Sequence, residues 1–519
     1  MHSSKTNCLP SRALGGAKED ATMNLLRVLF LSVPSVSSKN ARVQPTKRLM
    51  STTIVTAIAL IFFAAIPLRA QNGANAPDYV FSKLAALGDS APGGGTYTFD
   101  FEPYGINNRE DVLYVADLAA GPTSPCDIAT GIGCIGEGVY LVHQGQTSAL
   151  ARSGDPAPGG GTFFGALGSG AFGPGLSLNA QGDSAFVFFL QPLTPPVLNA
   201  GVYRYSHTTK MVTPVVVPNV TQAPGGGKFA GASIHASLNN EGELVFAGIV
   251  PSGAGHAGNG LGLGIFKVDA DGGGEISSLV SPGDRAPGGG SFDFAQNPWI
   301  NDRDDVAFGA HVAGEECVDV SGNPLICGES VYVMKTATGE IRSIAHQGEL
   351  APGGGKYRLA FGPVLNDSGE IAFIGDLTPE LGFGQSLGVF LHSGNKTIAI
   401  AHPGDPMPGG GNLLTAGFYV NTYDLNNHGD ISFTATLDTL TNKANDTGLY
   451  VWSRGSLHLV ARTGTVIPGV GTIVGLWPPA LAGGRAYIGG AMNERGQILF
   501  TATLDNGSGV LLIATPQEK

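Results

Sequence analysis

The chain has 519 residues, including 79 Gly and 33 Pro, and 42% of its residues are apolar. Only 13% are charged, about half of the roughly 25% usual in globular proteins, which argues against coiled coils and long solvated helices. After residue 70 there are 20 basic and 39 acidic residues, a balance that argues against binding to nucleic acid or to anionic lipid surfaces.

Residues 1–70 resemble a leader. Lys47 and Arg48 precede an apolar run at 54–66, which is followed by small residues ending at Ala70. This order predicts a secretory signal peptide cleaved after Ala70, and therefore an exported protein in the periplasm or outside the cell. A spanning helix needs about 20 apolar residues, so we expect no stable membrane span after cleavage; a permanent anchor is the alternative. Residues 71–519 then form one domain.

Cysteine usage agrees with export. Cys8 lies in the leader, and the other four cysteines form two close pairs in loops rich in Gly and Pro, Cys126 with Cys134 and Cys317 with Cys327. Neither pair shows the doubled CxxC or interleaved His of a zinc site. We predict two local disulfides, with four free thiols in a cytosolic protein as the alternative.

One block recurs seven times at intervals of 60 to 72 residues. It begins with an apolar residue followed by Asn, places Gly three residues after the Asn, and reaches an aromatic residue seven after it. Its asparagines are Asn107, Asn179, Asn239, Asn301, Asn366, Asn426 and Asn493, and Glu110 and Asp304 replace the Gly in two copies. Asn accepts from nearby backbone amides and Gly supplies a positive φ, so the block predicts a tight β-hairpin.

Two further blocks keep step with the Asn block. A Gly-Asp-x-x-Pro-Gly-Gly-Gly type block begins near Gly88, Gly154, Thr221, Gly283, Gly348, Gly404 and Gly464, and a short Gly-Val-Tyr type strand follows each Asn unit. Each repeat therefore predicts four antiparallel strands without helical periodicity, which is the composition of a propeller blade. We expect an all-β, seven-bladed β-propeller rather than an open solenoid.

The order of the chain ends supports a closed ring. The domain opens with YVFSKLAALGD, which reads as a lone fourth strand, and ends with GVLLIA, which reads as a third strand lacking its fourth. The N-terminal strand is therefore expected to complete the last blade and close the ring.

Two copies of the Asn block, LNAQGDSAF (178–186) and LNDSGEIAF (365–373), match the pattern NxxGxxAF. In these residues, and in repeats that cover nearly all of 78–515, the chain resembles the NxxGxxAF tandem-repeat family of bacterial exported proteins, a choice-of-anchor type. The resemblance implies secretion and a repeated β fold. It transfers no catalytic residue.

The blade topology predicts two unlike faces. The Asn turns emerge on one face, whereas the loops between strands two and three and the Pro-Gly blocks emerge on the other. The Asn turns resemble one another while the loops on the second face vary freely, and both cysteine pairs lie there. Irregular loops on a rigid frame usually carry binding residues, so we expect the loop-rich face to be the working face.

The acids of the Pro-Gly blocks lie on that face: Asp89, Asp155, Asp284, Glu349 and Asp405. One hypothesis is a broken ring of carboxylates that takes up Ca²⁺, which needs six to eight oxygen ligands. The favoured alternative is that each acid caps amides of its own loop, because one carboxylate per blade supplies too few ligands. On that basis no cofactor is expected.

Other motifs are weaker. Ser386 sits in a GxSxG match but between two strands, and Asp269 opens an incomplete calcium-loop pattern. His346 and His402 share a position with Arg152 and Arg462 before the Gly-Asp step, where we expect a solvated row on an outer strand. No catalytic residue is predicted.

Three functions remain open at this point. The first is an exported, non-catalytic propeller that binds a protein, a glycan or another envelope component through its loop-rich face. The second is a propeller hydrolase or lyase that uses acids near the central channel. The third is a purely structural component of the cell envelope.

Overall fold

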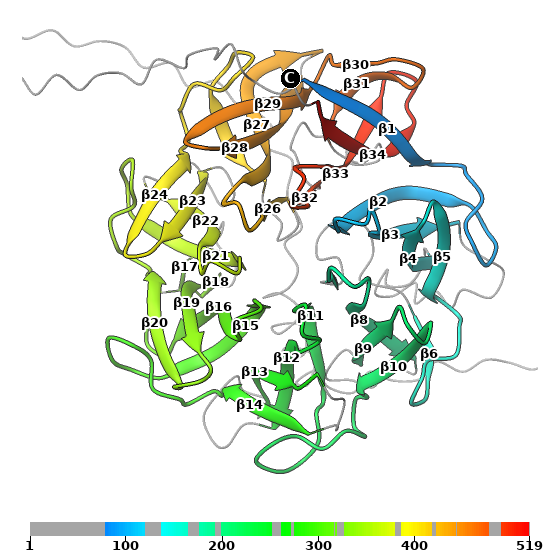
Figure 1. Cartoon of the computed structure of the whole chain (residues 1–519). Helices are drawn as coiled ribbons and strands as arrows, with labels where there is room; N and C mark the ends of the chain where they lie inside the picture. The colour runs from blue at the N-terminus through cyan, green and yellow to red at the C-terminus, as the bar shows by residue number, and fades with distance from the viewer. Residues whose placement is uncertain are drawn as a thin grey trace, which may run out of the picture.

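The computed structural model describes residues 78–119, 136–164, 176–191, 199–251, 261–270, 275–315, 317–318, 326–327, 329–378, 386–417, 422–442, 444–476 and 489–517. Every regular element within these ranges is a β-strand. Seven antiparallel sheets stand around a central axis (Figure 1). The expected all-β, seven-bladed propeller is therefore confirmed.

Blades 1, 3, 4 and 5 have four strands each, ordered from the axis outward. Blade 1 consists of β2 (Tyr97–Ile106), β3 (Val112–Leu118), β4 (Gly136–His143) and β5 (Gln146–Arg152). Blade 3 consists of β11 (Gly231–Leu238), β12 (Leu244–Pro251), β13 (Leu261–Val268) and β14 (Ile276–Val280). Blade 4 consists of β15 (Phe292–Ile300), β16 (Asp305–Val312), β19 (Ser330–Lys335) and β20 (Glu340–Ala345), and blade 5 of β21 (Tyr357–Leu365), β22 (Ile371–Leu377), β23 (Leu387–Ser393) and β24 (Lys396–Ala401).

In blades 2, 6 and 7 the inner strand is described in two pieces that pair with the same second strand. Blade 2 consists of β6 (Thr162–Phe163), β7 (Leu176–Leu178), β8 (Ser184–Gln191), β9 (Ala200–Ser206) and β10 (Met211–Val216). Blade 6 consists of β25 (Leu413–Ala416), β26 (Tyr423–Leu425), β27 (Ile431–Thr441), β28 (Ala444–Ser453) and β29 (Ser456–Arg462). Blade 7 contains β31 (Gly471–Gly475), β32 (Gly489–Met492), β33 (Ile498–Leu504) and β34 (Gly509–Pro516), with β30 (Val466–Ile467) at its edge.

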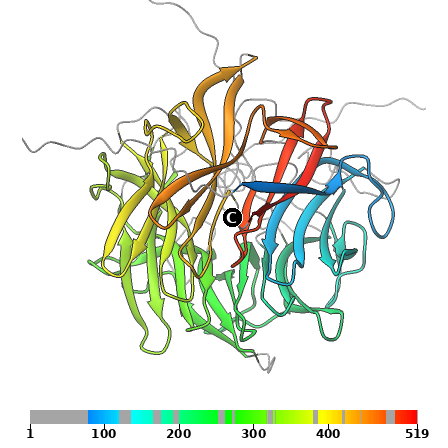
Figure 2. The same ribbon diagram turned by 45° about the horizontal axis from the view of Figure 1, so that its top comes forward.

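The ring closes as the sequence predicts. Strand β1 (Tyr79–Ala86) pairs antiparallel with β34, from Tyr79 opposite Pro516 to Ala86 opposite Val510. Both ribbon views show this first strand lying beside the last sheet (Figures 1 and 2). The rings of Phe81 and Phe500 also meet edge to face at 6.1 Å. Strands from the two ends of the domain thus share one blade, which fixes the seventh sheet between its neighbours.

The apolar core is a ring of clusters between the faces of adjacent blades. Within blades 1 to 5, aromatic residues of strands one, two and three pack together. In blade 1, Tyr114 stacks on Tyr140 with ring centroids 5.4 Å apart, and Tyr97 meets Tyr140 edge to face at 5.3 Å. Equivalent triads are Phe163, Phe186 and Tyr203; Phe229, Phe246 and Phe266; Phe292, Phe308 and Tyr332; and Tyr357, Phe373 and Phe390.

These triads explain the Gly of the Gly-Val-Tyr block. A Cβ on Gly138 would lie 2.7 Å from the ring of Tyr140, and one on Gly448 would lie 2.5 Å from the ring of Tyr450. The aromatic ring thus covers the bare backbone of the glycine two residues earlier. The motif is therefore a packing feature of the third strand.

The Asn block forms the predicted hairpin turn. In the fourth repeat, the Oδ1 atom of Asn301 accepts from the amides of Arg303 (3.1 Å) and Asp305 (2.9 Å). The Gly three residues after the Asn has positive φ in five turns, as at Gly182 (86°), and the replacements Glu110 and Asp304 also have positive φ, at 64° and 60°. The left-handed position is therefore kept even where a side chain makes it unfavourable.

The same asparagines also join the blades, a role that the sequence did not predict. Each Nδ2 donates to the backbone carbonyl oxygen of the corresponding Asn in the next blade, at 2.9 to 3.3 Å. The last of these bonds runs from Asn493 to Asn107, so seven bonds form a closed circle, which we call the Asn ring. Because the side chain must accept within its own turn and donate to the next, neither Asp nor Ser can replace Asn in full.

A second circle of bonds lies beside the Asn ring. The residue after each Asn donates its amide to the side chain of its counterpart in the next blade, as from Asp302 to Asp367 (2.9 Å). Six such links are present, and the seventh position is occupied by Ala180, which has no side-chain acceptor. One end of the propeller is thus tied together through polar contacts between turns.

We expect Asn301→Ala to lower the free energy of unfolding by about 3 kcal/mol, because two buried amides and one inter-blade carbonyl lose their partner. Asn301→Asp keeps the acceptor but places a carboxylate against the carbonyl of Asn366, so it should also destabilise. Denaturant unfolding at constant pH measures both. Asn395→Ala, in an exposed outer turn, is the control and should change stability by less than about 0.5 kcal/mol. An Asn301→Asp variant as stable as the wild type would show that donation between blades contributes nothing.

Candidate functional site

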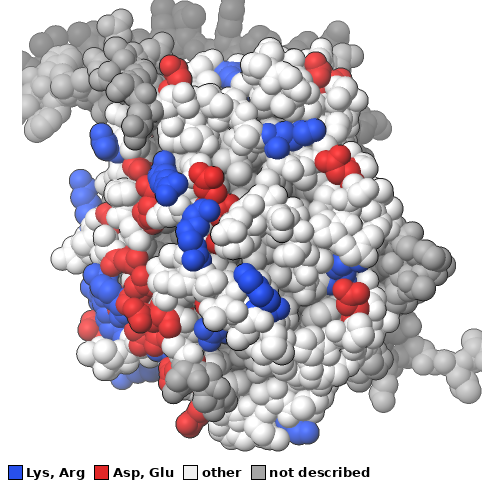
Figure 3. Space-filling view, turned by 45° about the vertical axis from the view of Figure 1, so that its right-hand side comes forward, with Lys and Arg blue, Asp and Glu red and all other residues white. Residues whose placement is uncertain are grey.

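The two ends of the propeller differ in the way the sequence predicts. The Asn turns join strands one and two at one end. The connections from strand two to three and from strand four to the next blade lie at the other end, which we call the loop-bearing end. Seen obliquely from one side, acidic and basic side chains are interspersed in a band, and much of the remaining surface is uncharged (Figure 3). The described residues in this view thus form no large patch of one sign.

Four of the five acids of the Pro-Gly blocks cap the end of the preceding outer strand. The carboxylate accepts from the amide three residues earlier, as from Ala86 to Asp89 (2.8 Å) and from Ser281 to Asp284 (2.7 Å), and likewise at Glu349 and Asp405. Where the acid is replaced, Thr465 makes the same bond with Arg462 at 2.9 Å. The capped amide lies at the end of the preceding outer strand. The prediction that each acid accepts from amides of its own Pro-Gly-Gly-Gly stretch therefore placed the cap a few residues too late in the sequence.

The structure does not gather these acids into one site. Asp89, Asp155, Asp284, Glu349 and Asp405 are all exposed, and each lies in the loop of its own blade. Among the described residues, no group of three or more His, Cys, Asp or Glu side chains is placed to hold a metal ion. Calcium binding by these acids stays a prediction.

The residues before the Gly-Asp step fasten the Pro-Gly loops. Arg152 donates from Nη2 to the carbonyl of Gly94 (2.6 Å), Arg462 from Nη1 to that of Gly410 (3.2 Å), and Nε2 of His402 lies 3.1 Å from that of Gly354. His346 contacts Glu315 instead, with 2.9 Å between Nε2 and Oε1. Three of these four residues therefore join an outer strand to a Pro-Gly loop, and His346 makes an ion-pair contact in its place.

The remaining sequence motifs carry little chemistry. Cys126 and Cys134 lie outside the described residues, whereas Cys317 and Cys327 are opposite each other in the backbone ladder of β17 (Cys317–Val318) and β18 (Ile326–Cys327). The disulfides stay a prediction. Ser386 is buried and lies directly before strand β23, so it is not at a strand-to-helix turn. The predicted leader and signal peptide also lie outside the described residues.

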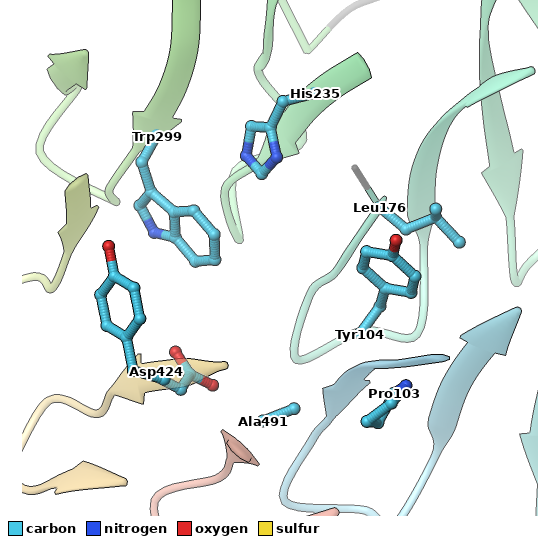
Figure 4. A pocket seen from close by; sticks show the side chains of 8 residues that line it. Pro103, Tyr104, Leu176, His235, Trp299, Asp424 and Ala491 are labelled. Carbon is cyan, nitrogen blue, oxygen red and sulfur yellow. The ribbon is translucent and has the colours of Figure 1, made fainter. Parts of the chain in front are cut away.

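A cavity of about 30 Å³ lies at the axis of the ring. Its described lining comes from the inner strands of six blades, two to four residues before each ring Asn, so the cavity adjoins the Asn ring on its loop-bearing side. Figure 4 shows Trp299 and His235 facing Tyr104 and Leu176 across this space, with Asp424 and Ala491 below. The lining residues are Pro103, Tyr104, Leu176, His235, Trp299, Tyr423, Asp424 and Ala491.

The polar groups of the axial cavity are unusual for a buried site. His235 stacks on Trp299 with 5.6 Å between ring centroids, and burial lowers the pKa of its imidazole to about 4, so it is neutral at physiological pH. Asp424 accepts from the amides of Met492 and Leu425, both at 2.8 Å, yet burial raises the pKa of its carboxyl to about 7. Tyr104 donates its hydroxyl to Glu102 (2.8 Å).

Further acids are buried between the cavity and the loop-bearing end. Burial, followed by the charge of Glu102, raises the pKa of Asp117 to about 8, and burial raises that of Glu329 to about 7. Burial likewise raises the pKa of Asp100 well above its usual value. In blade 5 a buried acid does have a basic partner, because the guanidinium of Arg358 binds Asp376.

Sequence reasoning missed the axial cavity and these buried acids. Most of these acids lie at positions that carry other residue types in the other repeats, so the repeated blocks draw no attention to them. One signal was present, since Asp117 and Asp376 both stand ten residues after their ring Asn, in otherwise apolar strands.

The raised carboxyl pKa values predict that stability falls as pH rises from 6.5 to 8. Across this window the folded state releases protons that the unfolded state has already lost, because unfolded acids titrate near pH 4. His235 makes a smaller and opposite contribution at the start of the window, because the unfolded imidazole still loses protons near pH 6.5 while the folded one, whose pKa is lowered, is already neutral. We expect a loss of about 1 kcal/mol through Asp117 alone, measured by denaturant unfolding across the window. Asp117→Asn should flatten this decline, whereas the exposed control Glu241→Gln should leave it unchanged; equal slopes for all three proteins would contradict the assignment.

The capping role of the acids is testable at Asp284. Since Thr465 makes the same bond in another blade, Asp284→Thr should keep wild-type stability, whereas Asp284→Ala should lose about 1 kcal/mol. Thermal unfolding measures both. Equilibrium dialysis with calcium addresses the other hypothesis: calcium binding that disappears in Asp155→Asn and Asp284→Asn variants would favour the carboxylate ring over a purely capping role.

Comparison with known proteins gives a family and a distant likeness of fold. No protein with a curated description matches the sequence. Among solved structures, the chain is similar to an acylaminoacyl peptidase from Pyrococcus horikoshii, with 11% identity over 78% of this chain and 49% of the peptidase and a TM-score of 0.40. It is similar to a puromycin hydrolase, with 14% identity over 80% of this chain and 53% of the hydrolase and a TM-score of 0.43. It is also similar to an α-L-arabinofuranosidase from Fusarium graminearum, with 9% identity over 73% of this chain and 98% of that enzyme and a TM-score of 0.37.

The chain spans about half the length of the peptidase and the puromycin hydrolase, and similarities this low carry no argument about function. The profile of a family of unknown function, DUF7453, matches twice, at residues 74–327 and 320–510. Together these matches cover most of the sequence, and the chain therefore belongs to the family of unknown function DUF7453.

Proposed function

We propose that this protein is an exported, non-catalytic propeller that binds a glycan or another component of the cell envelope at its loop-bearing end. The observation that carries the proposal is the difference between the two ends. At the Asn ring, amides and side chains are bonded to one another around the circle. Toward the loop-bearing end, Asp100, Asp117 and Glu329 each keep one carboxyl oxygen without a hydrogen-bond partner among the described residues.

This difference has an energetic reason. A buried polar atom without a partner costs about 1–3 kcal/mol, so a fold keeps such atoms when a ligand satisfies them or when they perform chemistry. The Asn ring supplies rigidity at one end, and the variable loops stand on that frame at the other. The arrangement suits recognition by the loop-bearing end.

The longest hairpin marks a part of this end that can be tested. Strands β27 and β28 form a hairpin that projects beyond the neighbouring blades (Figure 2). Leu440, near its tip, is 64% exposed. An exposed apolar side chain on a projecting hairpin is well placed to contact a partner.

We expect the mature chain to bind discrete members of a glycan array or of an envelope extract. Leu440→Asp should weaken that binding about tenfold, since it places a charge in the contact. Glu241→Gln, at the Asn end, is the control and should leave binding unchanged. If Glu241→Gln weakened binding and Leu440→Asp did not, the binding face would lie at the Asn end and the proposal would be wrong.

A second function is favoured by one observation, the pKa values near 7 of Asp424 and Glu329, because a carboxyl that is protonated near neutral pH is suited to general acid catalysis. A propeller hydrolase acting near the channel would use such a group. Release of nitrophenol from nitrophenyl glycosides and esters tests it. We expect no turnover. If the wild type released nitrophenol and Asp424→Asn did not, the hydrolase would be the better assignment.

A further inference from the structure

The axial cavity holds polar groups that the fold itself leaves unsatisfied. The side chains of His235 and Tyr423 line the cavity and belong to residues that are only 7% and 3% exposed. Among the described residues, Nδ1 of His235 and the hydroxyl of Tyr423 have no hydrogen-bond partner. Figure 4 shows the His235 ring turned into the space between Trp299 and Tyr104. Two buried atoms of this kind call for an occupant that can bond to both.

The ionisable groups at and behind the cavity are acids, which carry negative charge once they are deprotonated. Asp424 is the only charged residue in the described lining, and no Lys or Arg is among its members. Glu102 lies directly behind the lining, bonded to Tyr104, and burial, followed by the charge of Glu329, raises the pKa of Tyr423. Since His235 is neutral, no described group of the lining offsets these acids. A positively charged occupant would supply the missing counter-charge.

The size and the chemistry of the lining select among cations. A metal ion is poorly served, because the lining offers one carboxylate, already bonded to two amides, and one imidazole. Trp299, Tyr104 and Tyr423 instead surround the space with aromatic rings, which attract cations over their faces. A cavity of about 30 Å³ is large enough for a small polar group such as an ammonium head.

We propose that the axial cavity binds a primary ammonium group, such as the head of a lysine side chain or of an alkylamine. Asp424 supplies the counter-charge, the unpartnered atoms of His235 and Tyr423 accept from the ammonium protons, and the aromatic rings surround it. Leu176 and Pro103 offer apolar contact to the first methylenes of the attached chain. The site is separate from the loops that carry the proposed envelope binding.

Calorimetric titration of the mature chain with n-butylammonium chloride tests this site, and n-butanol is the neutral probe of similar shape. We expect heat of binding from n-butylammonium, and n-butanol should bind at least about tenfold more weakly, because it lacks the charge. Asp424→Asn should weaken n-butylammonium about tenfold. Tyr423→Phe keeps the aromatic ring and should weaken n-butylammonium binding about threefold. This second variant tests the site if Asp424→Asn does not fold. Glu241→Gln removes an exposed carboxylate and should bind as the wild type does.

Three results would overturn the assignment: no n-butylammonium binding by the folded wild type, equal binding of n-butanol, or Asp424→Asn and Tyr423→Phe variants that bind as tightly as the wild type. Equal binding of the two probes would mean that the cavity takes a neutral hydroxyl or a water. Array binding through the loop-bearing end is measured separately, so failure of the ammonium site leaves the proposed envelope binding standing, and the reverse also holds.

Discussion

The propeller depends on a circle of seven amide hydrogen bonds. Each ring Asn accepts within its own hairpin and donates to the backbone of the next, so one side chain fixes both the local turn and the position of the neighbouring blade. Sheets packed only through apolar faces can slide, because dispersion and burial are not directional. Directional bonds at one end remove that freedom. The pairing of β1 with β34 then closes the blade in which the two ends of the domain meet.

A rigid end allows the opposite end to vary. The Pro-Gly loops are fastened to their own blades through Arg152, Arg462 and His402, and their acids cap the preceding strand. The loops between strands two and three have no such common anchor in the sequence. The buried acids and the axial cavity lie on this side of the Asn ring, where several buried polar atoms have no hydrogen-bond partner among the described residues. The division between a bonded end and an unsatisfied end is thus the main physical basis for assigning function.

The buried carboxyls also link the proposed functions to pH. Their raised pKa values show that no described cation compensates for burial at Asp117, Glu329 or Asp424. By contrast, Asp376 is held by Arg358, and Lys267 joins Glu243 to Asp304 across two blades. The protein therefore uses its few basic side chains as structural partners and leaves a group of acids near the axis without them.

The sequence by itself determined the features that act within one repeat. The seven Asn blocks indicated hairpins, the positive φ at Glu110 and Asp304 followed from their register, and the lone strands at the ends of the domain indicated closure. These features depend on contacts between residues close in sequence, or on a period that repeats seven times. Only the tertiary structure decided the donation from Asn493 to Asn107, across 386 positions, and the meeting of Tyr104, His235, Trp299 and Asp424 at the axis. The physical reason is that these contacts arise between blades after the ring closes, from residues that differ among repeats, so neither local spacing nor periodicity could reveal them.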